Sequence, residues 1–258
     1  MDLNDPESML AWPLLLLPGL MCDQAVWTPL QAPLASRRDC TVVDYGLDDA
    51  LPQMARRVLA QAPERFVLAG HSMGGRVALE VHRLAPERVL GLALLDTGHL
   101  PRPAGQAGDD EAAKRMALLQ VAQSQGVRAM AMQWVRGMVH PSRLGDAELI
   151  ERILAMFSRK SAEVFECQIR ALLSRPDGSD VLRSLAVPTL LMCGAQDSWS
   201  PPAQHQAMLD LVSPAQAQLV LNDDAGHMAP MERPAAVAQA LLHWLDRCDV
   251  QATAFARP

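Results

Sequence analysis

Short apolar runs alternate along the chain with longer stretches that repeat apolar residues every three or four positions. The short runs are rich in leucine and valine, and most end at glycine, proline or aspartate, as strands buried on both faces of a parallel sheet do. They lie at residues 14–17, 40–44, 66–70, 89–96, 187–194 and 217–221. Helical spacing follows at residues 51–62, after residue 72 and from Pro234, before a tail that begins after Cys248. The pattern predicts an α/β fold with about six mostly parallel strands and helices on both faces of the sheet.

The pattern changes between the fourth and fifth of these strands. A polar segment rich in glycine and proline opens this part of the chain, and four stretches of helical character follow it, at residues 111–125, 127–138, 146–159 and 162–173. No strand-like run interrupts them. We therefore expect a core made of residues 1–98 and 184–258, with an all-helical insertion at residues 99–183.

One predicted strand passes into a helix with almost no loop, at Gly70-His71-Ser72-Met73-Gly74. Such a turn holds its central residue in strained backbone angles, so small residues are needed two positions before and after it. The serine hydroxyl then stands clear of the sheet, at the positive N-terminal end of the following helix. We interpret Ser72 as a nucleophile, with the Met73 backbone N–H as an oxyanion donor.

These residues resemble the α/β-hydrolase superfamily and, within it, the small capped bacterial serine esterases that include the pimeloyl-acyl-carrier-protein methyl ester esterases. The resemblance runs from about Leu14 to about Leu245. It implies that the helical insertion is a cap over the active site, and that the Leu20 N–H is the second oxyanion donor. Few residues precede the first strand, so we expect the antiparallel pair found there in the family to be missing.

A serine nucleophile needs a base, and seven histidines could supply it. His227 follows the last predicted strand, and the glycine before it lets the loop swing the imidazole over the sheet. Glu232 and Pro234 then fall at the family's spacing after the catalytic histidine. His71 neighbours the nucleophile, but we expect it to pack beneath the turn.

The third member of the site must be a carboxylate that orients the imidazole. Asp197 follows the strand that ends at Gly194 and gives the chain order Ser, Asp, His that this fold uses. Asp96 is the competing candidate, because it ends the strand that follows the Ser72 turn and its helix, a position that some relatives use.

The insertion should supply the substrate pocket, and its many methionines predict an apolar one. The candidate pocket residues are Met21, His99, Met132, His140, Met156 and Met228. Four cations, Arg102, Arg136, Lys160 and Arg170, could contact a carboxylate or a carrier protein, or could simply be solvated.

Composition narrows the class of protein further. A net charge of −6 without a basic cluster argues against nucleic acid and anionic membranes as partners. Five scattered cysteines are typical of reduced thiols and not of a metal site, so we expect no metal or cofactor. Acidic residues near the N-terminus do not suit a signal peptide, so we expect a cytoplasmic monomer or homodimer.

The sequence therefore predicts a serine hydrolase that cleaves a carboxylic ester of a small or medium-sized, largely apolar substrate through an acyl-enzyme. A thioesterase, a lactonase, or a carbon-carbon bond hydrolase or lyase could use the same residues. A ligand-binding receptor on a hydrolase scaffold is the alternative outside catalysis.

Overall fold

The computed structural model describes residues 12–255, with side chains described as far as Gln251. All six strands of its single sheet are parallel, in the order β2-β1-β3-β4-β5-β6, which confirms the predicted α/β fold. The strands are β1 (Leu14–Leu17), β2 (Cys40–Val42), β3 (Phe66–His71), β4 (Val89–Leu95), β5 (Thr189–Gly194) and β6 (Ala217–Asn222). No strand precedes β1 in the described chain. The prediction that an antiparallel pair is missing before the first strand also concerns residues 1–11, which lie outside the described residues.

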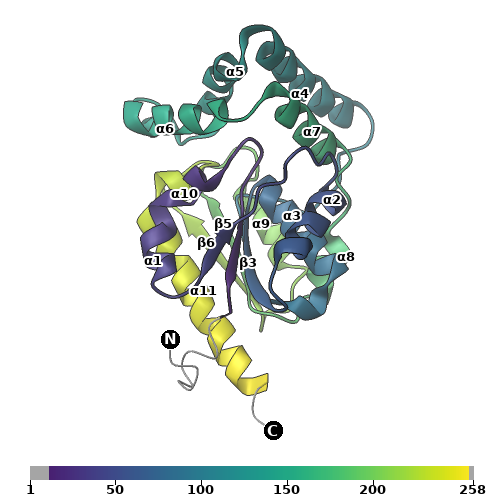
Figure 1. Ribbon diagram of the computed structural model, residues 1–258, viewed down its shortest axis with the longest axis vertical. Coiled ribbons are helices and arrows are strands. Elements are labelled where there is room, and N and C mark those ends of the chain that lie inside the picture. Colours follow the sequence, from purple (N-terminus) through teal and green to yellow (C-terminus); the bar gives the residue numbers. More distant parts are fainter. Residues whose placement is uncertain (1–11, 256–258) are drawn as a thin grey trace.

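Helices cover both faces of the sheet, as the periodicity predicted. In Figure 1 one face carries α2 (Leu51–Gln61), α3 (Met73–Leu84) and α8 (Ser179–Ser184). The other face carries α1 (Gln31–Ala35), α10 (Ala229–Glu232) and α11 (Pro234–Phe255). A further helix, α9 (Pro202–Leu209), contacts β5 and β6. Because α3 begins directly after β3, its N-terminus lies at the carboxyl edge of the sheet.

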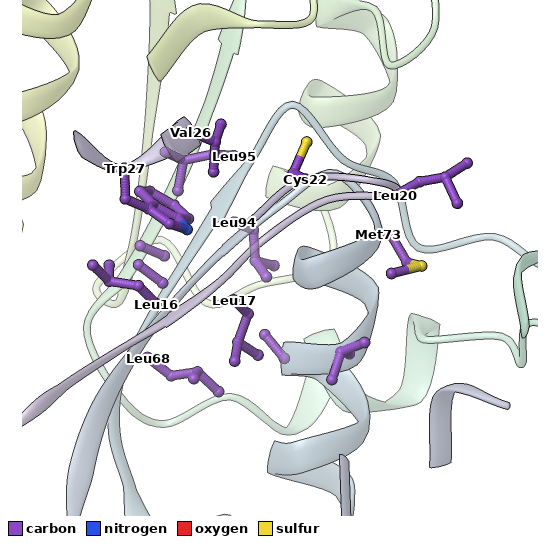
Figure 2. Packing of buried hydrophobic residues seen from close by; sticks show 14 of the residues in the cluster. Leu16, Leu17, Leu20, Cys22, Val26, Trp27, Leu68, Met73, Leu94 and Leu95 are labelled. Carbon is purple, nitrogen blue, oxygen red and sulfur yellow. The ribbon is translucent and has the colours of Figure 1, made fainter. Parts of the chain in front are cut away.

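The core forms where leucines of neighbouring strands meet these helices. Figure 2 shows Leu16 of β1, Leu68 of β3 and Leu94 of β4 among the buried side chains. Burial of each such side chain stabilises the fold by about 1.5–3 kcal/mol. The core is therefore a rigid base for the loops that follow the strands.

The terminal helix packs closely on this core. A Cβ atom at Gly91 of β4 would lie 2.4 Å from the Cys248 sulfur, and the Trp244 indole N–H donates to the Pro188 carbonyl over 2.9 Å. The tail predicted after Cys248 is wrong, since α11 continues to Phe255. No glycine or proline follows Cys248 until the end of the chain, so nothing there breaks the helix.

No strand lies between β4 and α8 in the described chain, and four α-helices make up most of it. They are α4 (Gln106–Gln125), α5 (Val127–Trp134), α6 (Ala147–Ser158) and α7 (Ala162–Leu173), and Figure 1 shows them beyond the carboxyl ends of the strands. Just before the predicted boundary at residue 184, α8 packs against α3. Residues 106–173, which comprise these four helices and the segments between them, are called the insertion below.

Salt bridges and hydrogen bonds attach the insertion to loops of the core. Arg159 after α6 forms a bidentate pair with Asp23, with N···O distances of 2.6 and 2.9 Å. Lys160 pairs with Asp44, which lies in the loop after β2. The loops that follow β1 and β2 therefore hold the insertion on one side.

Candidate active site

The turn between β3 and α3 holds Ser72 in a conformation that L residues rarely adopt. Ser72 has φ 54° and ψ −118°, and its N–H donates to the Leu95 carbonyl over 2.8 Å. A Cβ atom at Gly70 would lie 2.3 Å from the Gly74 carbonyl oxygen, and one at Gly74 would lie 2.1 Å from that of Leu17. Because a side chain cannot approach a backbone so closely, both positions require glycine.

Ser72, His227 and Asp197 form a continuous chain of hydrogen bonds. Ser72 Oγ lies 2.7 Å from His227 Nε2, and His227 Nδ1 lies 2.8 Å from Asp197 Oδ2. The three residues follow β3, β6 and β5, whose carboxyl ends share one edge of the sheet. A carboxylate at Nδ1 keeps the ring proton there and leaves Nε2 to accept the proton of the serine hydroxyl. The arrangement can therefore activate Ser72.

Backbone N–H groups fix the Asp197 carboxylate. Its Oδ1 atom accepts hydrogen bonds from the N–H groups of Trp199, at 2.8 Å, and Ser200, at 3.0 Å. Burial by itself would raise the pKa of Asp197, but the charge of His227 and these hydrogen bonds outweigh it and lower the pKa below its usual value. Asp197 is therefore ionised at neutral pH and faces the imidazole.

Asp96, the competing carboxylate, faces elsewhere. It is fully buried, its Oδ1 accepts from the Gly194 N–H at 2.9 Å, and no hydrogen bond joins it to His227 in the described chain. Burial and the nearby charge of Asp197 raise the pKa of Asp96 well above its usual value. The Asp96 carboxyl group therefore keeps its proton to a higher pH than a free aspartate does.

His71 packs beneath the turn. It is buried, and its Nε2–H donates to the His227 carbonyl over 2.8 Å. Burial lowers the pKa of His71 to about 3. On α9, burial likewise lowers the pKa of His205 to about 4, and its Nε2 accepts from the Thr97 N–H. Both rings are therefore neutral in the folded protein.

Folding should weaken in acid because of these two histidines. In the unfolded chain they bind protons below about pH 6.5, whereas in the folded chain they do not until pH 3–4. Their contribution to stability is complete above pH 6.5 and is lost as pH falls below it. Urea unfolding at pH 7 and pH 5 should show His71→Asn losing less stability than wild type, by about 1.4 kcal/mol for each pH unit below 6.5 and about 2 kcal/mol in all. Equal losses in both proteins would contradict this, and His243→Asn, at an exposed position, is the control.

Leu20 and Met73 present backbone N–H groups to the space beside Ser72. Both line the same cavity as Ser72, and Figure 2 shows them at the same end of the sheet. Within residues 12–255 neither N–H has a hydrogen-bond acceptor, whereas the Met21 N–H donates to Gln168 Oε1 of α7 over 2.8 Å. Two unpaired N–H groups beside a serine hydroxyl can hold an oxyanion.

Glu232 organises the loop that carries His227. Its buried carboxylate accepts from the N–H groups on either side of that residue, Gly226 at 2.9 Å and Met228 at 3.2 Å. The other carboxylate oxygen accepts from the His140 N–H in the insertion at 2.7 Å. The carboxylate thus ties the loop to the insertion.

A second hydrogen bond joins the same two segments. The His227 N–H donates to the Met138 carbonyl over 2.6 Å. A Cβ atom at Gly226 would lie 2.6 Å from that carbonyl oxygen, so the close approach depends on this glycine. Gly226, which we expected to give the loop flexibility, therefore also allows the insertion to approach the loop closely.

A cavity of about 1250 Å³ opens over Ser72 and His227, between the sheet and the insertion. Of the predicted pocket residues, His99 and Met228 line it. Met21 and Met156 are buried elsewhere, and His140 caps a short turn through Ser142. Met132 does not line the cavity, and 56% of its surface is exposed, because it lies on the outer side of α5.

The cavity is not uniformly apolar, contrary to the expectation from the methionines. Trp134, Phe157 and Trp199 line one part, where Trp199 stacks on Trp134 at 5.3 Å and lies 4.9 Å from the His227 ring. Charged side chains line another part, and sequence reasoning missed the one nearest the serine, Arg76. The signal was its spacing of four residues from Ser72, which puts both on one side of a helix.

Two negative findings concern the described chain. Between residues 12 and 255 no group of three or more His, Cys, Asp or Glu side chains is placed to hold a metal ion. Over the same residues no helix has the length and apolar character needed to cross a membrane.

The chain belongs to the α/β-hydrolase family, whose sequence pattern it matches over residues 14–240. It is 30% identical over 245 residues to pimeloyl-[acyl-carrier protein] methyl ester esterase of Klebsiella pneumoniae (strain 342), across 89% of this chain and 91% of that protein. These matches confirm the resemblance to the α/β-hydrolases that the residues around Ser72 indicated. The fold and these relatives together make the protein a hydrolase of the α/β class.

Solved structures give the same fold. A thermophilic esterase from Thermogutta terrifontis with bound malate has a TM-score of 0.81 and 28% identity, over 92% of this chain and 90% of that one. The enol-lactonase from Burkholderia xenovorans LB400 has a TM-score of 0.78 over 91% of this chain and 92% of that one. At 20% identity the second likeness concerns the fold alone.

Proposed function

We propose that the protein is a serine esterase that hydrolyses a carboxylic ester of a small or medium-sized molecule through an acyl-enzyme. The observation that carries this proposal is the hydrogen-bonded chain from Ser72 through His227 to Asp197, beside two unpaired N–H groups. The esterases among its relatives support the choice of reaction.

In the proposed reaction Ser72 Oγ attacks the ester carbon while His227 Nε2 takes the hydroxyl proton. The Leu20 and Met73 N–H groups hold the oxyanion, and Asp197 stabilises the imidazolium that forms. The imidazolium then gives its proton to the leaving alcohol, and the ester bond breaks. Water, activated by the same imidazole, attacks the acyl carbon and releases the acid and Ser72.

We further propose that the insertion acts as the cap of this site. It covers the carboxyl edge of the sheet and supplies cavity residues from α4, α5 and α6. A cap excludes water from the developing oxyanion, which strengthens its hydrogen bonds to the N–H donors. The cap also gives the site its size limit.

A substrate panel tests the reaction class. We expect kcat/KM for p-nitrophenyl esters to rise about fourfold with each methylene added to the acetate, because burying one methylene contributes about 0.8 kcal/mol. The rise should end, and kcat/KM should fall, once the cavity is full. Thioesters and lactones of matched acyl size are the comparison. A larger kcat/KM for either of these would transfer the proposal to a thioesterase or a lactonase, and binding without turnover of any of them would favour a receptor.

A further inference from the structure

Cations exceed acids around the cavity, although the whole chain is acidic. Its charged lining consists of five cations, Arg76, Arg102, Lys114, Arg115 and Arg175, and three acids, Asp110, Glu111 and Asp177. The chain as a whole carries a net charge of −6. A local excess of positive charge inside an acidic protein attracts an anionic group to the cavity.

Most of this charge is already paired within the protein. Arg175 forms a bidentate pair with Glu111, with N···O distances of 2.7 and 2.8 Å, and Arg115 contacts the same carboxylate at 3.0 Å. Glu111 therefore balances only one of the two guanidinium groups that it joins. The remaining positive charge faces Arg76.

Arg76 has no acidic partner in the described chain. Its single hydrogen bond goes from Nη1 to the Leu100 carbonyl at 2.8 Å, and Arg175 Nε donates to the same oxygen at 3.3 Å. A guanidinium has five N–H donors, so Arg76 keeps most of its donors for a ligand. Burial and the charge of Arg175 lower the pKa of Arg76 to about 9, a cost that a bound carboxylate would relieve.

Arg76 lies close enough to Ser72 in the chain for one small molecule to contact both residues. It lies one helical turn beyond Ser72 on α3, about 6 Å along the helix axis. The leaving alcohol must lie against His227 Nε2 to receive its proton, and the Trp199 ring occupies that side. With the alcohol on the side of Trp199, the acid portion is left to occupy the rest of the cavity, whose lining includes Arg76.

We propose that the natural substrate is a monoester of a dicarboxylic acid, whose free carboxylate binds to Arg76. This inference rests on the proposed ester hydrolysis and names its substrate class. The carboxylate and the guanidinium match in planar shape, so two parallel N–H···O bonds can form. Arg76 thereby selects the substrate and sets the register of the acyl carbon on Ser72.

Kinetics with matched methyl esters test the selection. Monomethyl succinate, glutarate and adipate should have kcat/KM at least tenfold above the dimethyl esters of the same acids. Arg76→Met should lower kcat/KM for the monoesters by about 10- to 100-fold, the effect of losing a charge-assisted hydrogen bond, and change the dimethyl esters less than threefold. Arg76→Lys should recover part of the loss, because it restores the charge without the planar fork.

The control is Arg152→Met, which removes the same charge from an exposed position on α6 that does not line the cavity. It should leave both classes of ester unchanged. Equal losses for monoesters and dimethyl esters in Arg76→Met, or a wild-type preference for the dimethyl esters, would overturn the proposal.

A binding measurement separates this inference from the proposed function. Calorimetry with Ser72→Ala protein should show binding of monomethyl glutarate that weakens at least tenfold when Arg76→Met is added, while binding of methyl pentanoate changes little. Unchanged affinity for monomethyl glutarate would overturn the Arg76 site even if esters are hydrolysed. Arg76-dependent binding without hydrolysis would support the site and contradict the esterase.

Discussion

Replacing Ser72 by alanine should lower kcat for the best ester by about 10⁶, while the protein still folds and binds substrate. The loss is large because the acyl-enzyme cannot form, and His227 and Asp197 then have no hydroxyl to activate. The residual rate comes from the two N–H donors and from substrate positioning. Single-turnover kinetics, with circular dichroism to confirm folding, measure the effect.

Covalent labelling checks the same assignment without kinetics. A p-nitrophenyl alkylphosphonate should add one phosphonyl group to the wild-type protein, and peptide mass spectrometry should place it on Ser72. Ser198→Ala is the matched control, since that serine lies near Asp197 but outside the cavity lining, and its labelling should equal that of wild type. An adduct on any other residue would remove Ser72 from the role of nucleophile.

Asp197→Asn should lower kcat by about 10⁴. The amide can still accept from the Trp199 and Ser200 N–H groups through its oxygen, which turns its NH₂ group toward His227. Nδ1 must then accept a hydrogen bond, so the ring proton moves to Nε2. Nε2 is then already protonated and cannot take the proton of Ser72. The tautomer, and not the fold, is what this substitution changes.

Asp96→Asn is the matched comparison and should cost less than tenfold. Burial raises the pKa of Asp96 and so favours its neutral form, which an amide of the same shape imitates. Its oxygen can keep the hydrogen bond from the Gly194 N–H. If Asp96→Asn loses more activity than Asp197→Asn, the orienting role belongs to Asp96.

The fold could be predicted because its signals are local. Runs such as residues 89–95 are apolar without interruption, so they mark buried strands wherever they occur. The requirement for glycine at position 70 is likewise local, since its close neighbour is the Gly74 carbonyl of the same turn, whereas Gly74 is required by the Leu17 carbonyl of β1. Chain order then singled out Asp197 and His227, which the structure brings within hydrogen-bond distance of each other.

The lining of the cavity could not be predicted in the same way. Whether a methionine on a helix faces the cavity, the core or the solvent depends on how the insertion sits on the sheet, and no local pattern states this. Met132 and Met156, both on insertion helices, lie in different surroundings for that reason. Arg76 was overlooked because an arginine four residues after a nucleophile looks like any solvated helix position until its acidic neighbours prove to be paired elsewhere.

The shared carboxylate of Glu232 has a consequence for how the molecule opens. His227 is held to the insertion through the Met138 carbonyl, and the same loop is held through Glu232 to the His140 N–H. Lifting this edge of the insertion would break both hydrogen bonds, which would leave the His227 N–H without its acceptor and the Glu232 carboxylate without its donor from His140. Under the proposed function, opening along this edge would loosen the loop that carries His227 before the sheet unfolds, so water that entered there would meet a histidine no longer held against Ser72.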